Sequence, residues 1–312
     1  MKRVVSVSIG SSNRDHKAQT EIFGEPYLIE RIGTDGSIPK AIELISKLDG
    51  KVNAFGIGGI DLYLSGANKT FMIKEALPIV NAAKITPVVD GTGIKNTLER
   101  ILIKHLQDKN IIDFSSKKVL LVCAIDRFKM AEAFFDIGCD TVLGDLIFAL
   151  GIPAPIRSLR VFRRVVNTLL PVVSKLPYEL LYPVGEKQEK ANRNRKFDKY
   201  YNDADIIAGD FLYIKKYLPE DLTDKIFITN TVTQADVDML KQRGAAVLIT
   251  STPEFSGRSF GTNVLEAILV AASEKKKSEL TEEVYIQLIN KMNYSPRVEY
   301  FNPWAGIGIR SL

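Results

Sequence analysis

A carboxylate, an amine and an amide occur together in the segment Asp90-Gly91-Thr92-Gly93-Ile94-Lys95-Asn96, which follows a short apolar run and opens a helical pattern. An Asp and a Lys in one cleft shift each other's pKa and can share a proton, as a general acid–base pair requires. We therefore predict Asp90 and Lys95 as catalytic residues and Asn96 as a substrate ligand. The sequence leaves open a helix capped by Thr92 with Lys95 in solvent.

A second candidate site lies at residues 256–263, where a loop with two hydroxyls and a guanidinium leads into another apolar helix. Free backbone N–H groups at a helix N-terminus bind anions. We predict Arg258 as a substrate ligand, and cofactor contacts from Ser259, Gly261, Thr262 and Asn263. The alternative is a polar loop in which Thr262 or Ser259 serves only as the helix cap.

Two further loops follow expected strands, and ligands in open α/β sheets bind beyond the carboxyl ends of the strands. Ser11, Ser12 and Arg14 come after the first strand, and Asp61 ends a segment with glycines at positions 56, 58 and 59. We predict all four as substrate-binding residues. The glycine spacing does not match a dinucleotide fingerprint, and a tight turn or bulge is the favoured interpretation of that segment.

The most apolar expected strand, residues 118–125, is followed by Asp126 and Arg127. This is the position of the cofactor loop in a nucleotide-binding unit, so both are predicted cofactor-binding residues. No glycine occurs there, which argues against the usual pyrophosphate cradle. A nicotinamide cofactor, NAD or NADP, would have to bind by an unusual loop.

Composition narrows the function classes. With two histidines and two cysteines among 312 residues, we expect no metal site. The net charge of +5 favours a small anionic partner and is too small for a nucleic-acid-binding domain. We interpret the basic segment 186–199 as a flexible lid at a cleft edge rather than a nucleic-acid contact. No window has the roughly 20 apolar residues of a membrane span, so we expect a cytoplasmic protein, with a homodimer left open.

These segments require an α/β fold to position them. We expect strands at residues 4–9, 52–57, 87–89 and 118–125, a hairpin over residues 20–32, and a helix capped by Ser37 with Pro39 in its first turn. From residue 205 onward strands and helices alternate, which predicts a parallel sheet. The predicted fold is two Rossmann-like α/β domains with largely parallel sheets and an interdomain cleft. Their expected ranges are 1–112 and 113–275, with residues 276–312 packing back on the domains.

Several of these segments carry a family resemblance. Residues 4–12 with Arg14-Asp15-His16, residues 30–36, residues 49–64 and residues 90–100 are similar to a bacterial family, common in anaerobic Firmicutes, that is labelled quinate 5-dehydrogenase. The resemblance covers the whole chain. It implies NAD(P)-dependent oxidation of quinate at a ring hydroxyl, with Ser6 and Ser8 loosely analogous to the paired serines that hold substrate in shikimate and quinate dehydrogenases.

Three hypotheses for function follow. The leading one is a dehydrogenase acting on a small polyhydroxylated anionic substrate. The second is a transferase with two facing α/β domains that holds a sugar nucleotide or another phosphorylated ligand. The third is a non-catalytic metabolite sensor whose cleft closes on its ligand.

Overall fold

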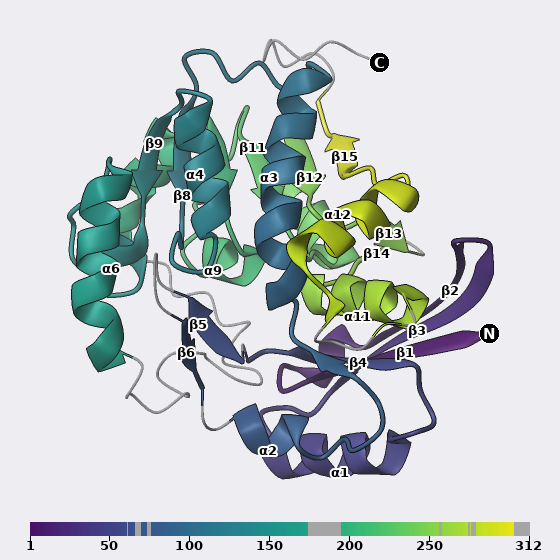
Figure 1. The fold of residues 1–312 in the computed structure, drawn as a ribbon. Helices are drawn as coiled ribbons and strands as arrows, with labels where there is room; N and C mark the ends of the chain where they lie inside the picture. The colour runs from purple at the N-terminus through teal and green to yellow at the C-terminus, as the bar shows by residue number, and fades with distance from the viewer. Residues whose placement is uncertain are drawn as a thin grey trace. The chain divides into compact units, whose positions relative to one another are not determined.

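The computed structural model describes residues 1–60, 62–65, 70–73, 76–173, 195–255, 258–273, 275 and 279–302. The chain divides into two units, each with its own sheet (Figure 1). Unit 1 contains Met1–Thr97, Leu170–Lys190 and Glu254–Ser295, and unit 2 contains Leu98–Leu169, Ala191–Pro253 and Pro296–Leu312. Both sheets are largely parallel, so the predicted α/β class is confirmed.

The sheet of unit 1 has five strands in the order β2-β3-β1-β4-β7. Strand β1 pairs in parallel with β3 and β4, and β4 pairs in parallel with β7. The predicted hairpin is confirmed: β2 and β3 are antiparallel and turn at Phe23 and Gly24, both with positive φ. The strands are β1 (Lys2–Ser8), β2 (His16–Ile22), β3 (Glu25–Gly33), β4 (Ala54–Gly58) and β7 (Val88–Val89).

Local signals determine the first helix, α1 (Ile38–Leu48). The Ser37 side chain accepts a hydrogen bond from Lys40 N, and Pro39 lies in the first turn, where its missing N–H has no helical partner to lose. At the other end, Asp49 accepts bonds from the backbone N–H groups of residues 84–86, which holds the pKa of Asp49 low, at about 2. The predicted cap and proline position are confirmed, and helix α1 packs on the core of one sheet face.

The opposite face of this sheet is covered by α11 (Thr262–Ser273), which packs on β1, β4 and β7. Every residue from Val264 to Ala271 is buried, as expected for a helix that is apolar on all sides. Helix α12 (Glu282–Lys291) contacts α11 and begins at a Thr281 cap. The remaining elements of unit 1 are η1 (Ser12–Arg14), β5 (Tyr63–Ser65), β6 (Thr70–Met72), α2 (Leu77–Val80), β13 (Glu254–Phe255) and β14 (Arg258–Ser259).

The sheet of unit 2 has six strands in the order β15-β12-β11-β10-β8-β9. Five are parallel, and β15 pairs antiparallel with β12. The predicted parallel run from residue 205 is confirmed as far as β12, whereas the antiparallel edge strand was not expected. The strands are β8 (Lys118–Leu121), β9 (Asp140–Leu143), β10 (Ile206–Ala208), β11 (Ile226–Thr229), β12 (Val247–Thr250) and β15 (Arg297–Tyr300).

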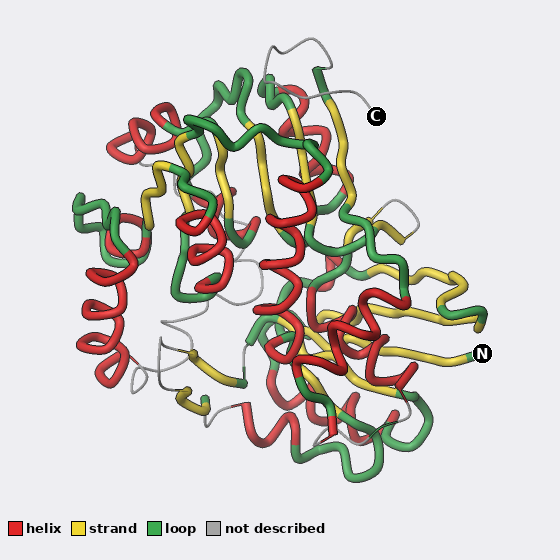
Figure 2. Tube along the Cα trace, turned by 45° about the horizontal axis from the view of Figure 1, so that its top comes forward, coloured by secondary structure: helices red, strands yellow, loops and turns green. Residues whose placement is uncertain are grey.

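Helices cover both faces of this sheet (Figure 2). The central strands β10, β11 and β12 are buried at every residue and mostly apolar, as strands covered on both faces must be. Alternate residues of β8, β10, β11 and β12 join one core cluster with α5, α8, α9 and α10. The helices of unit 2 are α4 (Phe128–Asp136), α5 (Asp145–Phe148), η4 (Arg195–Phe197), α8 (Asp198–Asp203), α9 (Phe211–Lys216) and α10 (Gln234–Gln242). Boundaries between the units fall within α3 (Thr92–Asp108) and within α6 (Leu159–Val173).

The units divide the chain differently from the expected boundaries. We placed residues 113–275 in one domain, but α11 packs on the sheet of unit 1. In the other direction, β15 brings part of the expected tail segment into the sheet of unit 2. The final residues, 303–312, and the basic segment up to residue 194 lie outside the described residues.

Candidate functional site

Each unit has its own carboxyl edge, where the parallel strands end and where α/β proteins bind ligands. In unit 1 the edge is formed by the residues after β1, β3, β4 and β7. In unit 2 it is formed by the residues after β8, β10, β11 and β12. The predicted site residues are distributed over both edges, so each edge is described by itself.

Asp90 follows β7 and holds the loops of the unit 1 edge together. Its carboxylate accepts hydrogen bonds from Leu62 N at 2.7 Å, from Thr92 N at 3.1 Å and from Thr92 Oγ1 at 2.8 Å. Lys95 lies further along α3 and is not among the partners of Asp90 within the described residues. The geometry of Asp90 therefore suits a structural role, and the Asp90–Lys95 proton pair stays a prediction.

A second buried acid lies beside this loop and was not expected from the sequence. Glu266, on α11, accepts hydrogen bonds from Gly91 N and from the Tyr285 hydroxyl, both at 2.7 Å. Burial and the adjacent carboxylate raise the pKa of Tyr285 well above its usual value, so the hydroxyl stays a donor. A Cβ atom at Gly93 would overlap the Glu266 carboxylate, which explains why residue 93 is glycine.

Replacing Tyr285 with phenylalanine should lower the free energy of unfolding by about 1.5–3 kcal/mol, because a buried carboxylate loses one of its donors. Urea denaturation of the two proteins measures the loss. Tyr300→Phe is the matched control, since Tyr300 is exposed, and should change stability by less than about 0.5 kcal/mol. Equal effects of the two substitutions would mean that the Tyr285 hydroxyl does not stabilise Glu266.

The first turn of α11 is packed against the sheet of unit 1. Asn263 Nδ2 donates to Ser6 Oγ at 2.8 Å. A Cβ atom at Gly56 would lie 2.7 Å from Asn263 O, and one at Gly91 would lie 2.7 Å from both Asn263 N and Thr262 Oγ1. Backbone at Gly91 therefore occupies the space beside these groups, where we predicted an anion.

The other predicted residues of that segment are placed as follows. Ser259 is fully buried in β14, and Gly261 O accepts the first hydrogen bonds of the helix, from Val264 N and Leu265 N. Arg258 pairs with Phe255 through the two-stranded sheet β13–β14. Gly261, rather than Thr262 or Ser259, therefore occupies the position before the helix, and the anion site at residues 259–263 stays a prediction. The side chains of Arg258 and Asn96, and all of Asp61, lie outside the described structure.

The loop after β1 is held from within by Arg31, which sequence reasoning missed. Arg31 Nη1 donates to Ser11 O at 3.0 Å, and Ser12 N donates to Asp35 Oδ1 at 2.6 Å. Burial, reinforced by the charge of Arg14, lowers the pKa of Arg31 to about 10. Ser11 is buried, whereas Ser12 and Arg14 retain exposed surface at this edge.

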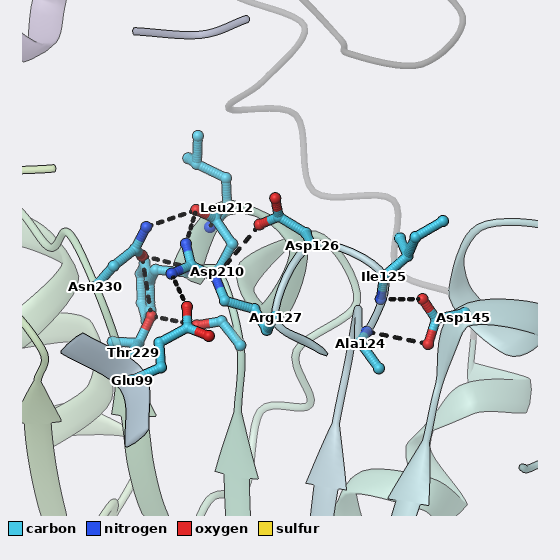
Figure 3. Close-up of polar contacts among 12 residues, drawn as sticks. Glu99, Ala124, Ile125, Asp126, Arg127, Asp145, Asp210, Leu212, Thr229 and Asn230 are labelled. Atoms are coloured by element: carbon cyan, nitrogen blue, oxygen red, sulfur yellow. Dashed lines mark hydrogen bonds and ion pairs between the residues drawn. The ribbon is translucent and has the colours of Figure 1, made fainter. Parts of the chain in front are cut away.

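The carboxyl edge of unit 2 is built around a buried arginine (Figure 3). The Arg127 side chain is only 3% exposed and faces Glu99, which is fully buried, at 2.6 Å. Its other nitrogens lie 3.3 Å from Asp126 and 3.4 Å from Asp210. Burial alone would lower the pKa of Arg127, but the three carboxylates raise it above its usual value. Arg127 is therefore a fixed internal cation, which argues against the direct cofactor contact that we expected.

Hydrogen bonds join the loops after the neighbouring strands of this edge. Asn230, after β11, donates to Asp210 Oδ2 at 2.7 Å, while Thr229 Oγ1 donates to Gly209 O at 2.8 Å. Thr252, after β12, donates from its hydroxyl to Asn230 O at 3.2 Å. The edge is thus preorganised, and Asp126 and Asp210 keep about a fifth of their side chains exposed, 20% and 22%.

Asp145 holds the loop that carries Asp126 and Arg127. Its two carboxylate oxygens accept hydrogen bonds from Ala124 N at 3.0 Å and Ile125 N at 2.9 Å (Figure 3). Desolvation raises the pKa of Asp145 to about 6, outweighing these bonds, and the charge of Asp126 adds to the increase. The loop before Arg127 therefore depends on an acid with a pKa near neutrality.

Because the pKa of Asp145 is raised on folding from 3.8 to about 6, the folded state binds more protons than the unfolded state between these values. The contribution of Asp145 to the free energy of unfolding should therefore fall as pH rises through this window, by on the order of 1 kcal/mol, and become constant above it. The protein is compared with its Asp145→Asn variant by urea denaturation at several pH values. The contributions of the other carboxyl groups to stability are the same in both proteins and cancel in the difference. The advantage of Asp145 over Asn should be larger near pH 4.5 than near pH 7.5; the opposite trend would contradict the raised pKa.

The six predicted cofactor residues do not form one cluster in either unit. Asp126 and Arg127 belong to unit 2, and Ser259, Gly261, Thr262 and Asn263 belong to unit 1. Glu99, Asp145, Asp210 and Asn230 were missed. Asn230 follows β11 directly and Asp210 is the second residue after β10, so both lie where ligands of α/β sheets bind.

The described residues contain no group of three or more His, Cys, Asp or Glu residues able to hold a metal ion. In the same part of the chain, no helix combines the length and apolar character needed to cross a membrane.

Residues 93–301 match the family model described as Domain of unknown function (DUF8754), and residues 3–90 match the one described as Domain of unknown function (DUF8753). No curated protein matches the sequence.

Three solved structures are similar only at TM-scores below 0.5, too low to support an argument about ligand or reaction. GanP, a glucose-galactose binding protein from Geobacillus stearothermophilus, has a TM-score of 0.37 and 8% identity, covering 97% of this chain and 98% of its own. A periplasmic ribose ABC transporter from Conexibacter woesei has a TM-score of 0.35 and 8% identity, with coverages of 93% and 94%. Unliganded arylmalonate decarboxylase has a TM-score of 0.26 and 11% identity, with coverages of 87% and 93%.

Proposed function

The chain belongs to the family described as Domain of unknown function (DUF8754), and that description implies no ligand. From the geometry of its own residues, we propose that the protein binds a small polyhydroxylated molecule at the carboxyl edge of the unit 2 sheet. One observation carries this proposal: a preorganised polar cluster lies where the parallel strands of an α/β sheet present their ligand-binding loops. In this cluster, the side chains of Asp126 and Asp210 are partly exposed, and both lie beside the Arg127 guanidinium.

Hydroxyl groups suit this set of side chains. A carboxylate oxygen accepts from a ligand hydroxyl, and the acceptors of Asp126 and Asp210 are fixed before the ligand arrives, which reduces the entropy lost on binding. Arg127 compensates part of the carboxylate charge from below the surface. The same arrangement would serve a sensor or an enzyme, because both must hold their ligand in a fixed orientation.

The test is isothermal titration calorimetry against uncharged hexoses, inositols, quinate and shikimate, followed by NAD⁺ and NADP⁺. Asp126→Asn should weaken binding of the best ligand by about 10- to 100-fold, the loss expected for a hydrogen bond to a charged acceptor. Asp203→Asn makes the same chemical change to an exposed residue before β10, at the amino edge of the same sheet, and should leave affinity unchanged.

Three outcomes distinguish the hypotheses. Saturable binding of a polyol that Asp126→Asn weakens and Asp203→Asn does not supports the proposal. Reduction of NAD⁺ or NADP⁺ in the presence of quinate would establish the dehydrogenase reaction that the family resemblance implies. Binding that is insensitive to Asp126→Asn would locate the ligand elsewhere and refute the proposed site.

A further inference from the structure

The sheet of unit 1 becomes polar at the carboxyl end of the face that α11 covers. Nearer the other end of the strands, Val4, Ile29 and Ala54 lie side by side on this face and belong to one apolar core cluster. The next two rows across β3, β1 and β4 hold Arg31, Ser6 and Gly56, and then Gly33, Ser8 and Gly58. A buried core does not need polar residues and glycines, so this end of the face calls for another explanation.

The hydroxyl group of Ser8 lacks an acceptor for its hydrogen. Ser8 is 4% exposed, and its Oγ accepts hydrogen bonds from Gly10 N at 3.1 Å and from Arg31 Nη2 at 3.0 Å. A hydroxyl group has two acceptor lone pairs and one donor, so these two bonds use the whole acceptor capacity of Oγ. Among the residues that the structure describes, none accepts the remaining hydrogen. A buried donor without an acceptor destabilises a fold, so the structure lacks a partner here.

Arg31 has unused donors beside this hydroxyl group. A guanidinium has five N–H donors. Three bonds engage those of Arg31, to Ser11 O, Asp15 Oδ1 and Ser8 Oγ, and no other partner lies in the described part of the chain. The Arg31 side chain is 11% exposed, and although burial lowers its pKa to about 10, it is charged at neutral pH. Unpaired donors of a cation and of a buried hydroxyl group therefore lie side by side.

Glycine at position 58 keeps the Ser8 hydroxyl group accessible. A Cβ atom at Gly58 would lie 3.1 Å from Ser8 Oγ and 3.3 Å from Asn263 Nδ2. The φ angle of Gly58 lies outside the left-handed region, so its backbone conformation does not require glycine. Gly58 and Asn263 are both partly exposed, so solvent reaches this part of the edge. Space beside the hydroxyl group accounts for glycine at this position.

We infer that unit 1 binds an oxyanion, the phosphate or carboxylate group of a small molecule, at Ser8, Arg31 and Gly58. An ionised group of this kind offers acceptors, and its bonds to a guanidinium are charge-assisted and frequently bidentate. It supplies the acceptors that the Ser8 hydroxyl group and Arg31 lack. The site lies after β1, β3 and β4, where α/β sheets present their ligand-binding loops. It is separate from the polyol site proposed in unit 2 and does not depend on it.

Titration of inorganic phosphate and, separately, of acetate into the isotope-labelled protein tests the site, in a buffer without other oxyanions. The NMR spectra should show a saturable shift of the Arg31 Nε–H resonance and of the backbone amides of Ser8 and Gly58. Arg31→Lys assigns the side-chain resonance by its loss. The ion that saturates at the lower concentration identifies the phosphate or the carboxylate form of the ligand. No saturable shift at these residues with either ion would overturn the inference, whatever binds to unit 2.

Two variants test the geometry of the site. Ser8→Ala removes the hydroxyl donor and should weaken binding of the tighter ion by about 10-fold or more, the loss expected for a hydrogen bond to a charged acceptor. Gly58→Ala keeps both donors but places a methyl group 3.1 Å from Ser8 Oγ, and should also weaken binding. It keeps the test decisive if Ser8→Ala folds poorly.

Ser46→Ala is the matched control. It makes the same chemical change at an exposed residue of α1, which packs on the opposite face of the same sheet, and should leave the affinity unchanged. Affinity for the ion that stays unchanged in both Ser8→Ala and Gly58→Ala would place the ion elsewhere and refute the site.

Discussion

Replacing Arg127 with leucine should lower the free energy of unfolding by about 3–5 kcal/mol, the largest effect that we expect from a single charge removal in this protein. Arg127 is buried and lies 2.6 Å from Glu99, which is also fully buried. Without the guanidinium, Glu99 must either stay charged without its cation or take up a proton. Urea denaturation near neutral pH measures the loss.

The double variant Arg127→Leu/Glu99→Leu tests whether Arg127→Leu loses stability because the buried Glu99 carboxylate no longer faces the guanidinium. Replacing both partners by apolar residues removes the uncompensated carboxylate, so the double variant should recover much of the stability that Arg127→Leu loses. The single variant Glu99→Leu completes the comparison. If the stability loss of the double variant equals the sum of the losses of the two single variants, Arg127 stabilises the fold through packing rather than through its pairing with Glu99.

Gly91→Ala should be the most disruptive of the small substitutions in unit 1, with an expected loss of about 3 kcal/mol or more. Two costs combine at this position. Gly91 has a φ of +94°, which side chains rarely adopt, and an added Cβ would lie 2.7 Å from the backbone N of Asn263. The clash is with helix backbone, which cannot rotate out of the way as a side chain can.

Gly24→Ala is the matched control for this prediction. Gly24 also has a positive φ, +77°, but nothing lies within 4 Å of an added Cβ. It should therefore lose only about 1 kcal/mol, the cost of the backbone conformation alone. The difference between the two variants, measured by urea denaturation, isolates the effect of α11 packing at Gly91. Equal losses would rule out that packing as the reason for glycine at position 91.

Elements of local structure could be predicted from the sequence where neighbouring residues determine them. The Ser37 cap, the Pro39 position and the hairpin around Gly24 each depend on residues a few positions apart, and the structure contains all three. In unit 2, β8 was located by its continuous apolar character, and β10, β11 and β12 by their alternation with helices. These signals suffice for the α/β class and for two largely parallel sheets.

Which sheet a helix packs on is not a local property. Helix α11 follows β12 and continues the alternation of strands and helices, so the sequence pattern assigned it to the sheet of unit 2. Its place in unit 1 depends on glycines at positions 56 and 91, which let its backbone approach β4 and the loop after β7. The sequence of α11 itself contains no signal for these two glycines, which lie far from it in the chain.

The candidate site was predictable in part for the same reason. Asp126 and Arg127 were found because they follow a strand directly, but Glu99 lies 28 positions before Arg127 on a helix, and Asp210 lies 83 positions after it. Pairing across such distances follows from tertiary structure alone. Asp210 and Asn230 also lie after strands, but single polar residues there carried no signal that distinguished them from ordinary loop residues.

The late position of α11 in the sequence has a consequence for the order in which the protein can fold during its synthesis. Ser6, on the first strand, bonds to Asn263, 257 positions later, and Gly91 bonds to Glu266, 175 positions later. Contacts of such long sequence separation slow folding. A nascent chain that has emerged only as far as β12 holds every parallel strand of unit 2, whereas in unit 1 one face of β1 and β4 still lacks its covering helix. We therefore expect the strands of unit 1, which are made first, to wait through the synthesis of the parallel strands of unit 2 for the helix that covers them, with an apolar strand face exposed to aggregation in the interval.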